Sequence, residues 1–246
     1  MPEGDTIHRA ANTLRGVLEG KPLLRIDVPR ARGRRPEPGT PIESVDAIGK
    51  HLVITFADRT TLRTHMQMTG AWHVYKTGER WRKAAHLARA VIEVDGWVAV
   101  CFQAPVVELE TEPRSADAIG HLGPDLTRPD ADVDTAATRM TGAVEVGVAL
   151  LDQRVASGIG NIFRSETLFA THTNPFTLAD DLDHQQKVEL FTAASKLLQA
   201  SVAAHRSSPA VYGRAGQPCP RCGTPIRAQR QGAQQRTTYW CPTCQK

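Results

Sequence analysis

The stretch "LLDQRVASGIGNIFRSETLF", residues 150–169, decides the fold class. Its apolar spacing predicts one helix that ends near Gln153 and a second helix that begins after two closely spaced glycines, Gly158 and Gly160. We expect Asn161 to cap the second helix. Free backbone amides at a helix start form an anion site, and glycines let a ligand approach them closely. The stretch therefore predicts two helices joined by a turn that can bind phosphate.

The helical apolar spacing continues over residues 143–205, on both sides of this stretch. It predicts at least three helices, at about 144–152, 161–170 and 183–204. Arg154 and Arg164 add positive charge close to the turn. As chemistry alone, this region is a helical unit with a turn suited to phosphate.

The N-terminal part of the chain has a different pattern. Residues 3–18 carry apolar side chains at helical spacing, and Gly20 and Pro22 end that helix. Short alternating segments follow as far as about Leu109, separated by Gly, Asp and Pro clusters, which predicts a mostly antiparallel sandwich or barrel. The expected strands are "LLRIDV" (23–28), "HLVITF" (51–56), "TLRTHMQM" (61–68), "AWHVY" (71–75), "RAVIEV" (89–94) and "WVAVCF" (97–102). The basic segment "RARGRRPEPG", residues 30–39, predicts a solvated turn.

Four of the five cysteines form two pairs near the C-terminus. Cys219 and Cys222 flank "PR", Cys241 and Cys244 flank "PT", and residues 223–240 separate the pairs. This is the spacing of a zinc ribbon, in which four thiolates close a tetrahedral structural site. Two disulfides are the alternative, which a reducing cytosol disfavours. The fifth cysteine, Cys101, lies in an expected strand and is interpreted as a buried apolar residue.

Charge is distributed unevenly along the chain, which carries a net charge of +4. Residues 190–246 contain eight basic and no acidic side chains, which leaves 22 basic and 26 acidic side chains in residues 1–189. A basic segment on a mildly acidic body favours a polyanionic partner. The hairpin expected between the cysteine pairs carries Arg227, Arg230 and Arg236, which suits phosphate or groove contact. A solvated hairpin that only packs on the body is the alternative.

The length of 246 residues suits two domains with an appended module. The acidic, proline-containing segment "LGPDLTRPDADVDT" predicts a domain linker. We expect a multidomain α+β protein with an N-terminal antiparallel β-sandwich domain at 1–125, a linker at 126–134, a helical domain at 135–205 and a zinc-finger hairpin at 206–246. The sequence shows neither an apolar run of membrane-spanning length nor a signal-peptide pattern, so a cytoplasmic protein is expected.

The start of the chain, "MPEGDTIHR", allows two interpretations. Proline is favourable at the first helical position, and acids suit the positive end of the helix dipole. Alternatively, the start is a processing site, because removal of Met1 would leave the secondary amine of Pro2 beside the carboxylate of Glu3. Such an amine can attack an aldehyde or hemiacetal carbon. Taken alone, Lys50 in "GKHL" and His65 in "HMQMTGAW" are more typical of a solvent-facing lysine and a structural histidine.

Together these motifs resemble one family, the bifunctional DNA glycosylases that include formamidopyrimidine-DNA glycosylase and endonuclease VIII. The resemblance covers nearly the whole chain in order: "MPEG", then "GKHL", then "HMQMTGAW", then "QRVASGIGNIFRSETL", which matches the family's helix–two-turn–helix, and finally "QRTTYWCPTCQ" in its zinc finger. The resemblance implies a helix–two-turn–helix DNA-binding domain after the sandwich and one structural zinc ion per chain.

The resemblance also implies the chemistry. In this family Met is removed and the exposed proline amine attacks C1′ of a damaged nucleoside, so Pro2 is the expected nucleophile. Glu3 is the expected proton shuttle, and Lys50 would hold or protonate the lesion nucleotide. The implied activity is that of a DNA glycosylase and abasic-site lyase of base excision repair, which cleaves the strand by β- and then δ-elimination through a Schiff base.

The DNA contacts implied by the resemblance come from three places. Asn161 and Arg236 would grip phosphates around the lesion, and Arg236 also counts among the catalytic residues. The amides of Gly158 and Gly160 would assist them. A base must leave the stack for this chemistry, and the wedge expected to fill the void is formed by Gln67, Met68 and Thr69. The alternative for Met68 is a core methionine in a strand.

"PEG" at the start and "QMTGAW" favour the endonuclease VIII branch, especially its actinobacterial members. The implied substrates are oxidised pyrimidines such as thymine glycol, 5-hydroxycytosine and dihydrouracil. Relatives usually carry a second acid ("PEGPE") where this chain has Asp5 and Thr6. Because Thr6 cannot act as a carboxylate, either Asp5 substitutes for that acid or the base-release step is altered.

Two competing hypotheses follow from the same residues. A catalytically silent protein that binds damaged or junction DNA would keep the phosphate contacts without chemistry. An unrelated zinc-ribbon regulator would make the Pro2 start and "GIGN" coincidences. For the leading hypothesis we expect damaged DNA as the partner, a monomer, and a cytoplasmic, nucleoid-associated location.

Overall fold

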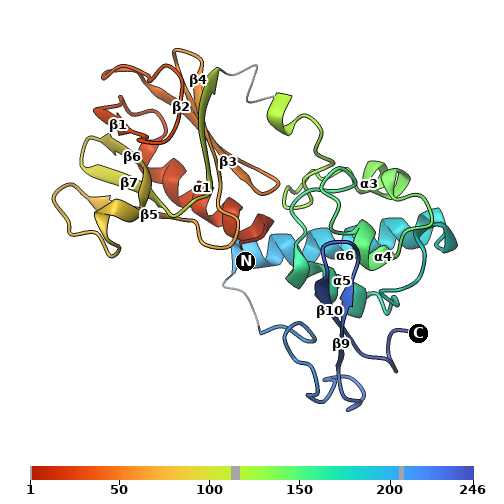
Figure 1. Ribbon diagram of the computed structural model, residues 1–246. Coiled ribbons are helices and arrows are strands. Elements are labelled where there is room, and N and C mark those ends of the chain that lie inside the picture. Colours follow the sequence, from red (N-terminus) through yellow and green to blue (C-terminus); the bar gives the residue numbers. More distant parts are fainter. Residues whose placement is uncertain (1, 112–116, 205–207) are drawn as a thin grey trace. The chain divides into compact units, whose positions relative to one another are not determined.

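The computed structural model describes residues 2–111, 117–204 and 208–246. The chain forms two compact units, Met1–His121 and Leu122–Lys246, shown in Figure 1. The helices of the described residues all fall short of the length and apolarity that crossing a membrane requires.

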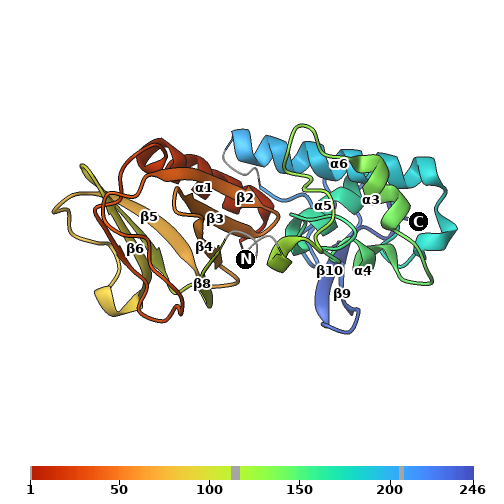
Figure 2. The same cartoon turned by 90° about the horizontal axis from the view of Figure 1, so that it is seen from above.

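The first unit is built from two four-stranded antiparallel sheets (Figure 2). One sheet has the order β1-β6-β7-β5, with β1 Arg25–Asp27, β6 Ala88–Val94, β7 Trp97–Phe102 and β5 Ala71–Lys76. The other has the order β2-β3-β4-β8, with β2 Ile42–Ile48, β3 His51–Phe56, β4 Thr60–His65 and β8 Val106–Thr111. A short 3-10 helix, η1 Ala85–Leu87, precedes β6. The predicted antiparallel sandwich is confirmed.

Helix α1, Gly4–Leu18, closes the core of this unit. Its apolar face is buried through Ile7, Ala11, Leu14 and Leu18, which pack with apolar residues of both sheets. Helical spacing of apolar side chains predicted this face, and burial of each of its Ile and Leu side chains contributes about 1.5–3 kcal/mol. The six predicted strands are present with small shifts of their ends.

Two strands, β2 and β8, were missed by the sequence analysis. β2 carries "IESVDAI" and β8 carries "VVELET", both with acids between their apolar residues. In β8 the pairing with β4 neutralises one of these acids. The register sets Glu108 opposite Arg63, and the two side chains form an ion pair. A contact between residues so far apart in sequence is invisible to local patterns.

The second unit is helical apart from one hairpin. Its helices are α3 Val133–Arg139, α4 Val146–Ala149, α5 Asn161–Ala170 and α6 His184–Ala203, with a 3-10 helix η2 Ala179–Asp181. Asp183 begins α6 with a capping box to Gln186. The three predicted helices correspond to α4, α5 and α6, although α4 is a single turn. Apolar side chains of all four α-helices form one core.

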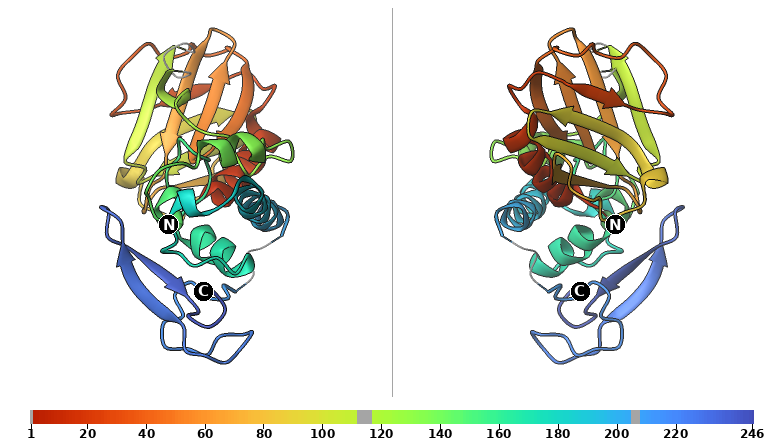
Figure 3. Two further views of the ribbon diagram at one scale, coloured as in Figure 1. Left: turned by 90° about the vertical axis from the view of Figure 1, so that its right-hand side faces the viewer. Right: turned by 90° about the vertical axis from the view of Figure 1, so that its left-hand side faces the viewer.

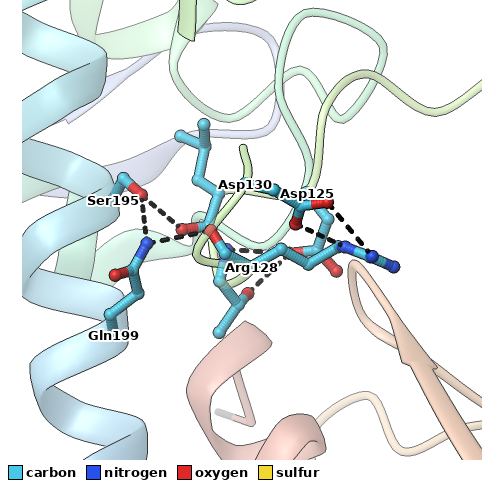
Figure 4. A network of polar contacts seen from close by, with 7 residues as sticks. Asp125, Arg128, Asp130, Ser195 and Gln199 are labelled. Atoms are coloured by element: carbon cyan, nitrogen blue, oxygen red, sulfur yellow. Dashed lines mark hydrogen bonds and ion pairs between the residues drawn. The ribbon is translucent and has the colours of Figure 1, made fainter. Parts of the chain in front are cut away.

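Residues 126–134, assigned to a linker from the sequence, lie within the second unit. Leu126 is fully buried in its core, and α3 already begins at Val133. Two side chains of α6 hold this segment, as Figure 4 shows: Ser195 Oγ donates to the carbonyl oxygen of Leu126 (2.8 Å) and Gln199 Nε2 donates to that of Arg128 (2.9 Å). An acidic, proline-containing composition predicts a turn-rich segment and does not reveal such long-range bonds.

The C-terminal hairpin consists of β9 Arg227–Gln231 and β10 Arg236–Trp240, paired antiparallel. Figure 3 shows it in blue as a two-stranded arm of the second unit. Its base packs on the end of α5, where Phe169, Val211, Cys219, Ile226 and Cys241 form a small apolar cluster. This confirms the predicted finger hairpin.

Candidate nucleic-acid interface and catalytic residues

Pro2 lies just outside helix α1. The N-cap is Glu3, with an extended backbone, and its carbonyl oxygen accepts the first amide bonds, from Thr6 (2.9 Å) and Ile7 (3.2 Å). Proline is therefore not at the first helical position, and the helix-start interpretation of Pro2 is wrong. The Glu3 side chain is completely buried, whereas Pro2 is partly exposed. The amine of Pro2 would stand at the positive end of the helix dipole, which favours its neutral, nucleophilic form.

Asp5 and Thr6, where relatives carry "PE", are tied to each other on the first turn of α1. The buried Asp5 carboxylate forms an ion pair with Arg9 (3.1 Å) and accepts a hydrogen bond from Thr6 Oγ1 (3.2 Å). Arg9 also donates to Thr6 Oγ1 (3.5 Å). An ion pair with a guanidinium stabilises the charged carboxylate, so Asp5 is poorly suited to donate a proton in place of the missing acid.

Lys50 lies in the turn between β2 and β3, next to a pair of histidines. His51 and His65 face each other on β3 and β4, with ring centroids 4.8 Å apart. Burial, together with the charges of His65 and Arg63, lowers the pKa of His51 to about 3. Burial and the charge of Lys50 also lower the pKa of His65. Both imidazoles are therefore neutral near pH 7. The cations beside them are Lys50 in the turn and Arg63 on β4, and Arg63 forms an ion pair with Glu108.

The turn after β4, residues 67–69, is the segment that the resemblance assigns to a wedge, and we call it the wedge turn. Met66 is buried in the core, whereas Met68 is 70% exposed, so the core-methionine interpretation of Met68 is wrong. Gln67 has a left-handed φ of 45°, and its amide donates to His65 Nδ1 (3.1 Å). Thr69 Oγ1 donates to the carbonyl oxygen of Gln103 (3.0 Å). The structure thus gathers Lys50 and the turn 67–69 at one end of the sheet β2-β3-β4-β8.

In the second unit, the segment before α5 is held in place by close packing. Gly158 has a φ of +99°, and its amide donates to Gln153 Oε1 (3.2 Å). A Cβ at Gly158 would stand 3.0 Å from Thr127 Oγ1, so a larger residue would displace this neighbour as well as strain the backbone. Gly160 has an extended backbone and forms the N-cap of α5.

Asn161 does not cap α5, contrary to the prediction. It is the first helical residue, and its side chain is directed to β10 instead: Nδ2 donates to the carbonyl oxygen of Thr237 (2.9 Å), and Oδ1 accepts from Arg164. Because the Gly160 backbone takes the N-cap position, the Asn161 amide group is available to bind the finger.

Arg164 connects the helical part of the unit to the finger. It is fully buried, and its guanidinium donates to the carbonyl oxygens of Gly147 (3.2 Å) and Thr237 (3.0 Å) and to Asn161 Oδ1. The sequence indicated only a charge near the turn. Burying a guanidinium is costly unless its donors are bonded, so the role of Arg164 is to fix Asn161 against β10.

Arg236 begins β10 beside a cavity of about 400 Å³. The cavity lies between the turn 151–154 and the hairpin turn 232–234, and Arg154 lines it too. Arg236 Nε donates to Gln234 Oε1 (2.9 Å). Asn161 and Arg236, distant in sequence, are thus brought together at one side of the second unit, with the turn amides before α5 nearby.

The four finger cysteines form a compact sulfur cluster. All four Sγ atoms lie within 4.8 Å of one another, and the neighbouring pairs 219–244, 222–241 and 222–244 are 3.9, 3.5 and 3.5 Å apart. Four sulfurs at about 2.3 Å from a tetrahedral zinc would be about 3.8 Å apart. The donor set therefore fits one structural zinc. By contrast, Cys101 is fully buried, and burial raises its thiol pKa to about 12.

Two polar residues that hold the finger, the half-buried Glu166 and the buried Gln231, were missed in the sequence. Both carboxylate oxygens of Glu166 on α5 accept backbone amides, from Ala210, Val211 and Tyr212 (2.8–3.0 Å). Gln231 Nε2 donates to Glu145 and to the carbonyl oxygen of Pro175, both at 2.9 Å. Long polar side chains bound to distant backbone have no local sequence pattern, so neither could have been found.

Comparisons with known proteins agree with these features. Residues 1–105 match the Formamidopyrimidine-DNA glycosylase N-terminal domain, residues 122–212 the Formamidopyrimidine-DNA glycosylase H2TH domain, and residues 216–246 the zinc finger found in FPG and IleRS. The chain is 37% identical to a "Probable endonuclease 8 2" of Streptomyces coelicolor, over all of this chain and 94% of that protein. It is equally 37% identical to the "DNA-(apurinic or apyrimidinic site) lyase Nei2" of Mycolicibacterium smegmatis, over all of this chain and 99% of that protein.

A solved structure shares the fold. A complex of the Lactococcus lactis formamidopyrimidine-DNA glycosylase with DNA that contains N7-benzyl-Fapy-dG superposes with a TM-score of 0.86 over the whole of both chains, at 20% identity. These similarities define the class: the protein belongs to the family of formamidopyrimidine-DNA glycosylases and endonucleases 8. Among its relatives are actinobacterial endonuclease 8 proteins, as the sequence motifs indicated.

Proposed function

We propose that this DNA glycosylase and abasic-site lyase removes oxidised pyrimidines from DNA, with the amine of Pro2 as its nucleophile. The observation that carries the proposal is the start of α1, where Pro2 lies outside the helix and the adjacent Glu3 carboxyl is completely buried. A buried carboxyl beside an amine is the pair that proton transfer during Schiff-base chemistry requires.

In the proposed reaction, the Pro2 nitrogen forms a bond to C1′ and the damaged base leaves with a proton. Loss of the ring-oxygen bond at C1′ gives an iminium ion. The iminium withdraws electrons and makes the C2′ hydrogen acidic, so a proton leaves C2′ as the 3′ phosphate departs. A second elimination releases the 5′ phosphate. Glu3 is the group positioned to carry protons to the sugar oxygen and from C2′.

The described residues also supply binding groups for such a substrate. Lys50 is a cation beside two neutral histidines, and the exposed Met68 is an apolar side chain suited to replace a flipped base. Asn161 and Arg236 lie together on the second unit and suit phosphate contacts. The basic segment 190–246 adds the positive charge that a polyanion requires.

The pyrimidine preference is supported by the relatives named endonuclease 8, which match the whole chain. A panel of duplexes tests it: thymine glycol, 5-hydroxycytosine, dihydrouracil, 8-oxoguanine and an abasic site, each measured under single turnover. We expect cleavage of the three pyrimidine lesions and the abasic site, with 8-oxoguanine at least about tenfold slower. Faster release of 8-oxoguanine than of every pyrimidine lesion would contradict the proposed substrate class.

The panel also decides the alternative of a catalytically silent binder. That alternative is favoured by Thr6 in place of an acid and by the ion pair that engages Asp5. It predicts salt-sensitive binding to all five duplexes without cleavage of any of them. Cleavage of the abasic site with no base release would assign the defect to the glycosylase step alone. The monomeric state and the cytoplasmic, nucleoid-associated location stay predictions of the sequence.

A further inference from the structure

The arginine loop, residues 30–35, runs beside the edge of the sheet β2-β3-β4-β8. Ala31 is buried in the core of the first unit and Pro36 is buried where the loop ends, whereas Arg30, Arg32 and Arg34 are exposed. Beside these buried residues the loop presents the guanidinium groups of Arg30, Arg32 and Arg34 to solvent, whereas the fourth, that of Arg35, donates to the carbonyl oxygen of Val28 (3.1 Å). The sequence predicted only a solvated turn here.

The loop is in close contact with strand β8, which is an edge strand of the sheet β2-β3-β4-β8. Gly33 has a φ of +114°, and a Cβ at this position would stand 2.5 Å from the carbonyl oxygen of Leu109. Only glycine fits both the conformation and the approach. The flanking Arg32 and Arg34 are therefore held at the sheet edge by a contact that a longer side chain would break.

Two neighbouring cavities lie along β8. The larger, about 770 Å³, is lined by Arg30, Arg32 and Arg34 together with residues 107–110 of the strand. The smaller, about 240 Å³, shares Arg30 and Val107 with the first and adds Arg89 and residues 103–105. Arg30 thus belongs to both cavities, which makes one continuous cationic surface along the strand.

The carboxylates on this surface do not cancel its charge. Glu108 forms an ion pair with Arg63, on the neighbouring strand β4. Glu110 is the other acid in the larger cavity, against three arginines. Other carboxylates of the unit bind other arginines, such as Glu93 with Arg25.

The surface begins beside the wedge turn. Thr69 Oγ1 donates to the carbonyl oxygen of Gln103, and Lys83 Nζ donates to Gln103 Oε1 (3.2 Å). Gln103 itself lines the smaller cavity with Arg30 and Arg89. The cations Lys83, Arg89, Arg30, Arg32 and Arg34 therefore extend from the wedge turn to the far end of β8; we call them the arginine track.

We propose that the arginine track binds the phosphate backbone of the DNA on one side of the lesion, beyond the phosphates next to the flipped nucleotide. Strand β8 has six residues, or about 20 Å, which corresponds to about six base pairs of B-DNA. Arginine suits this role because its planar fork bonds two phosphate oxygens at once. The inference rests on the proposed function, since the wedge turn sets where the lesion lies.

The test uses duplexes with an uncleavable abasic-site analogue near one end, with a short arm of about 4 base pairs and a long arm of about 14, in both orientations. The track predicts that lengthening only one of the two arms tightens binding by the wild-type protein. In the variant Arg30→Gln/Arg32→Gln/Arg34→Gln this gain disappears. The slope of log Kd against log salt for that duplex falls by about 2–3, at about 0.9 for each lost phosphate contact.

A matched control is Lys21→Gln/Arg25→Gln/Lys76→Gln, which removes the same charge elsewhere in the first unit. This control should keep the one-sided gain. The proposal is overturned if the arginine variant keeps the gain, if both arms contribute equally, or if the control loses as much as the variant. Binding of polyglutamate is measured with the same proteins. If the arginine variant loses polyglutamate binding while its binding to both DNA arms is unaffected, the partner is an acidic polypeptide and the proposal is overturned. Absence of cleavage by the wild type would refute the proposed function while leaving this binding result readable.

Discussion

The wedge turn of the first unit and the start of α5 in the second unit are both turns at which we propose DNA contacts, but they are built in opposite ways. Met68 is 70% exposed in its turn, and the neighbouring backbone amide of Gln67 donates one hydrogen bond, to His65 Nδ1. Asn161, by contrast, is bonded to β10 and to the fully buried Arg164, which itself reaches Gly147 and Thr237. From this difference we expect a division of labour, in which the first unit inserts and reacts and the second binds phosphates rigidly.

The largest expected effect concerns the reactive group of the first unit. Pro2→Gly and Glu3→Gln should each lower the single-turnover rate on a thymine glycol duplex by about 10²–10⁴-fold, because the first changes the nucleophile and the second removes the proton carrier. Binding to an uncleavable abasic analogue should stay within about threefold of wild type. Wild-type rates in both variants would refute a reactive role for the start of α1.

The next largest effect should arise from the rigid side of the comparison. Arg164→Met keeps an unbranched apolar stem but removes the guanidinium donors to Gly147, Asn161 and Thr237. We expect DNA affinity to fall by about 10–100-fold, because Asn161 loses the partner that orients it. The exposed cation Lys196 on α6 supplies the control, since Lys196→Met removes one charge and leaves the bonds of Arg164 and Asn161 in place. Equal losses in both variants would mean that Arg164 acts only through its charge.

A smaller and more selective effect is expected for Met68→Ala. Cleavage of a lesion in a fully paired duplex should slow by about tenfold, because nothing fills the space of the flipped base. Cleavage of the same lesion in an unpaired bubble should change by less than about twofold, since little stacking is lost there. Leu24, another exposed apolar residue of this unit, offers a control as Leu24→Ala. Equal slowing on paired and unpaired substrates would exclude a wedge role.

The smallest effect concerns acid stability of the first unit. The pKa of His51 is lowered to about 3 in the folded protein, mainly by burial, from 6.5 when unfolded. The unfolded chain therefore binds more protons between these values, so the free energy of unfolding falls as pH drops from about 6.5 toward 3. His51→Gln should flatten this fall by on the order of 1–3 kcal/mol.

Urea unfolding followed by tryptophan fluorescence measures this change, since Trp72, Trp81 and Trp97 all lie in the first unit. His86→Gln, at an exposed histidine of the same unit, should leave the pH dependence as in the wild type. An unchanged pH dependence in His51→Gln would show that another group controls acid stability.

The sequence predicted the elements with strong local patterns. Helix α1, the helices α5 and α6, six strands and the four cysteines were all found from periodicity and spacing. Strands β2 and β8 were missed because acids interrupt them, and the ion pair between Glu108 of β8 and Arg63 is a long-range contact. The capping role predicted for Asn161 is wrong because a cap is the local expectation, whereas the side chain bonds to Thr237, 76 residues further along the chain.

Borohydride trapping on a duplex with an abasic site, followed by mass spectrometry of the linked peptide, tests directly whether Pro2 is the nucleophile. Borohydride reduces the iminium to a stable amine, so we expect a covalent adduct on Pro2 in protein that has lost Met1. An adduct on a lysine, or no adduct in protein that lacks Met1 and binds the duplex, would contradict it.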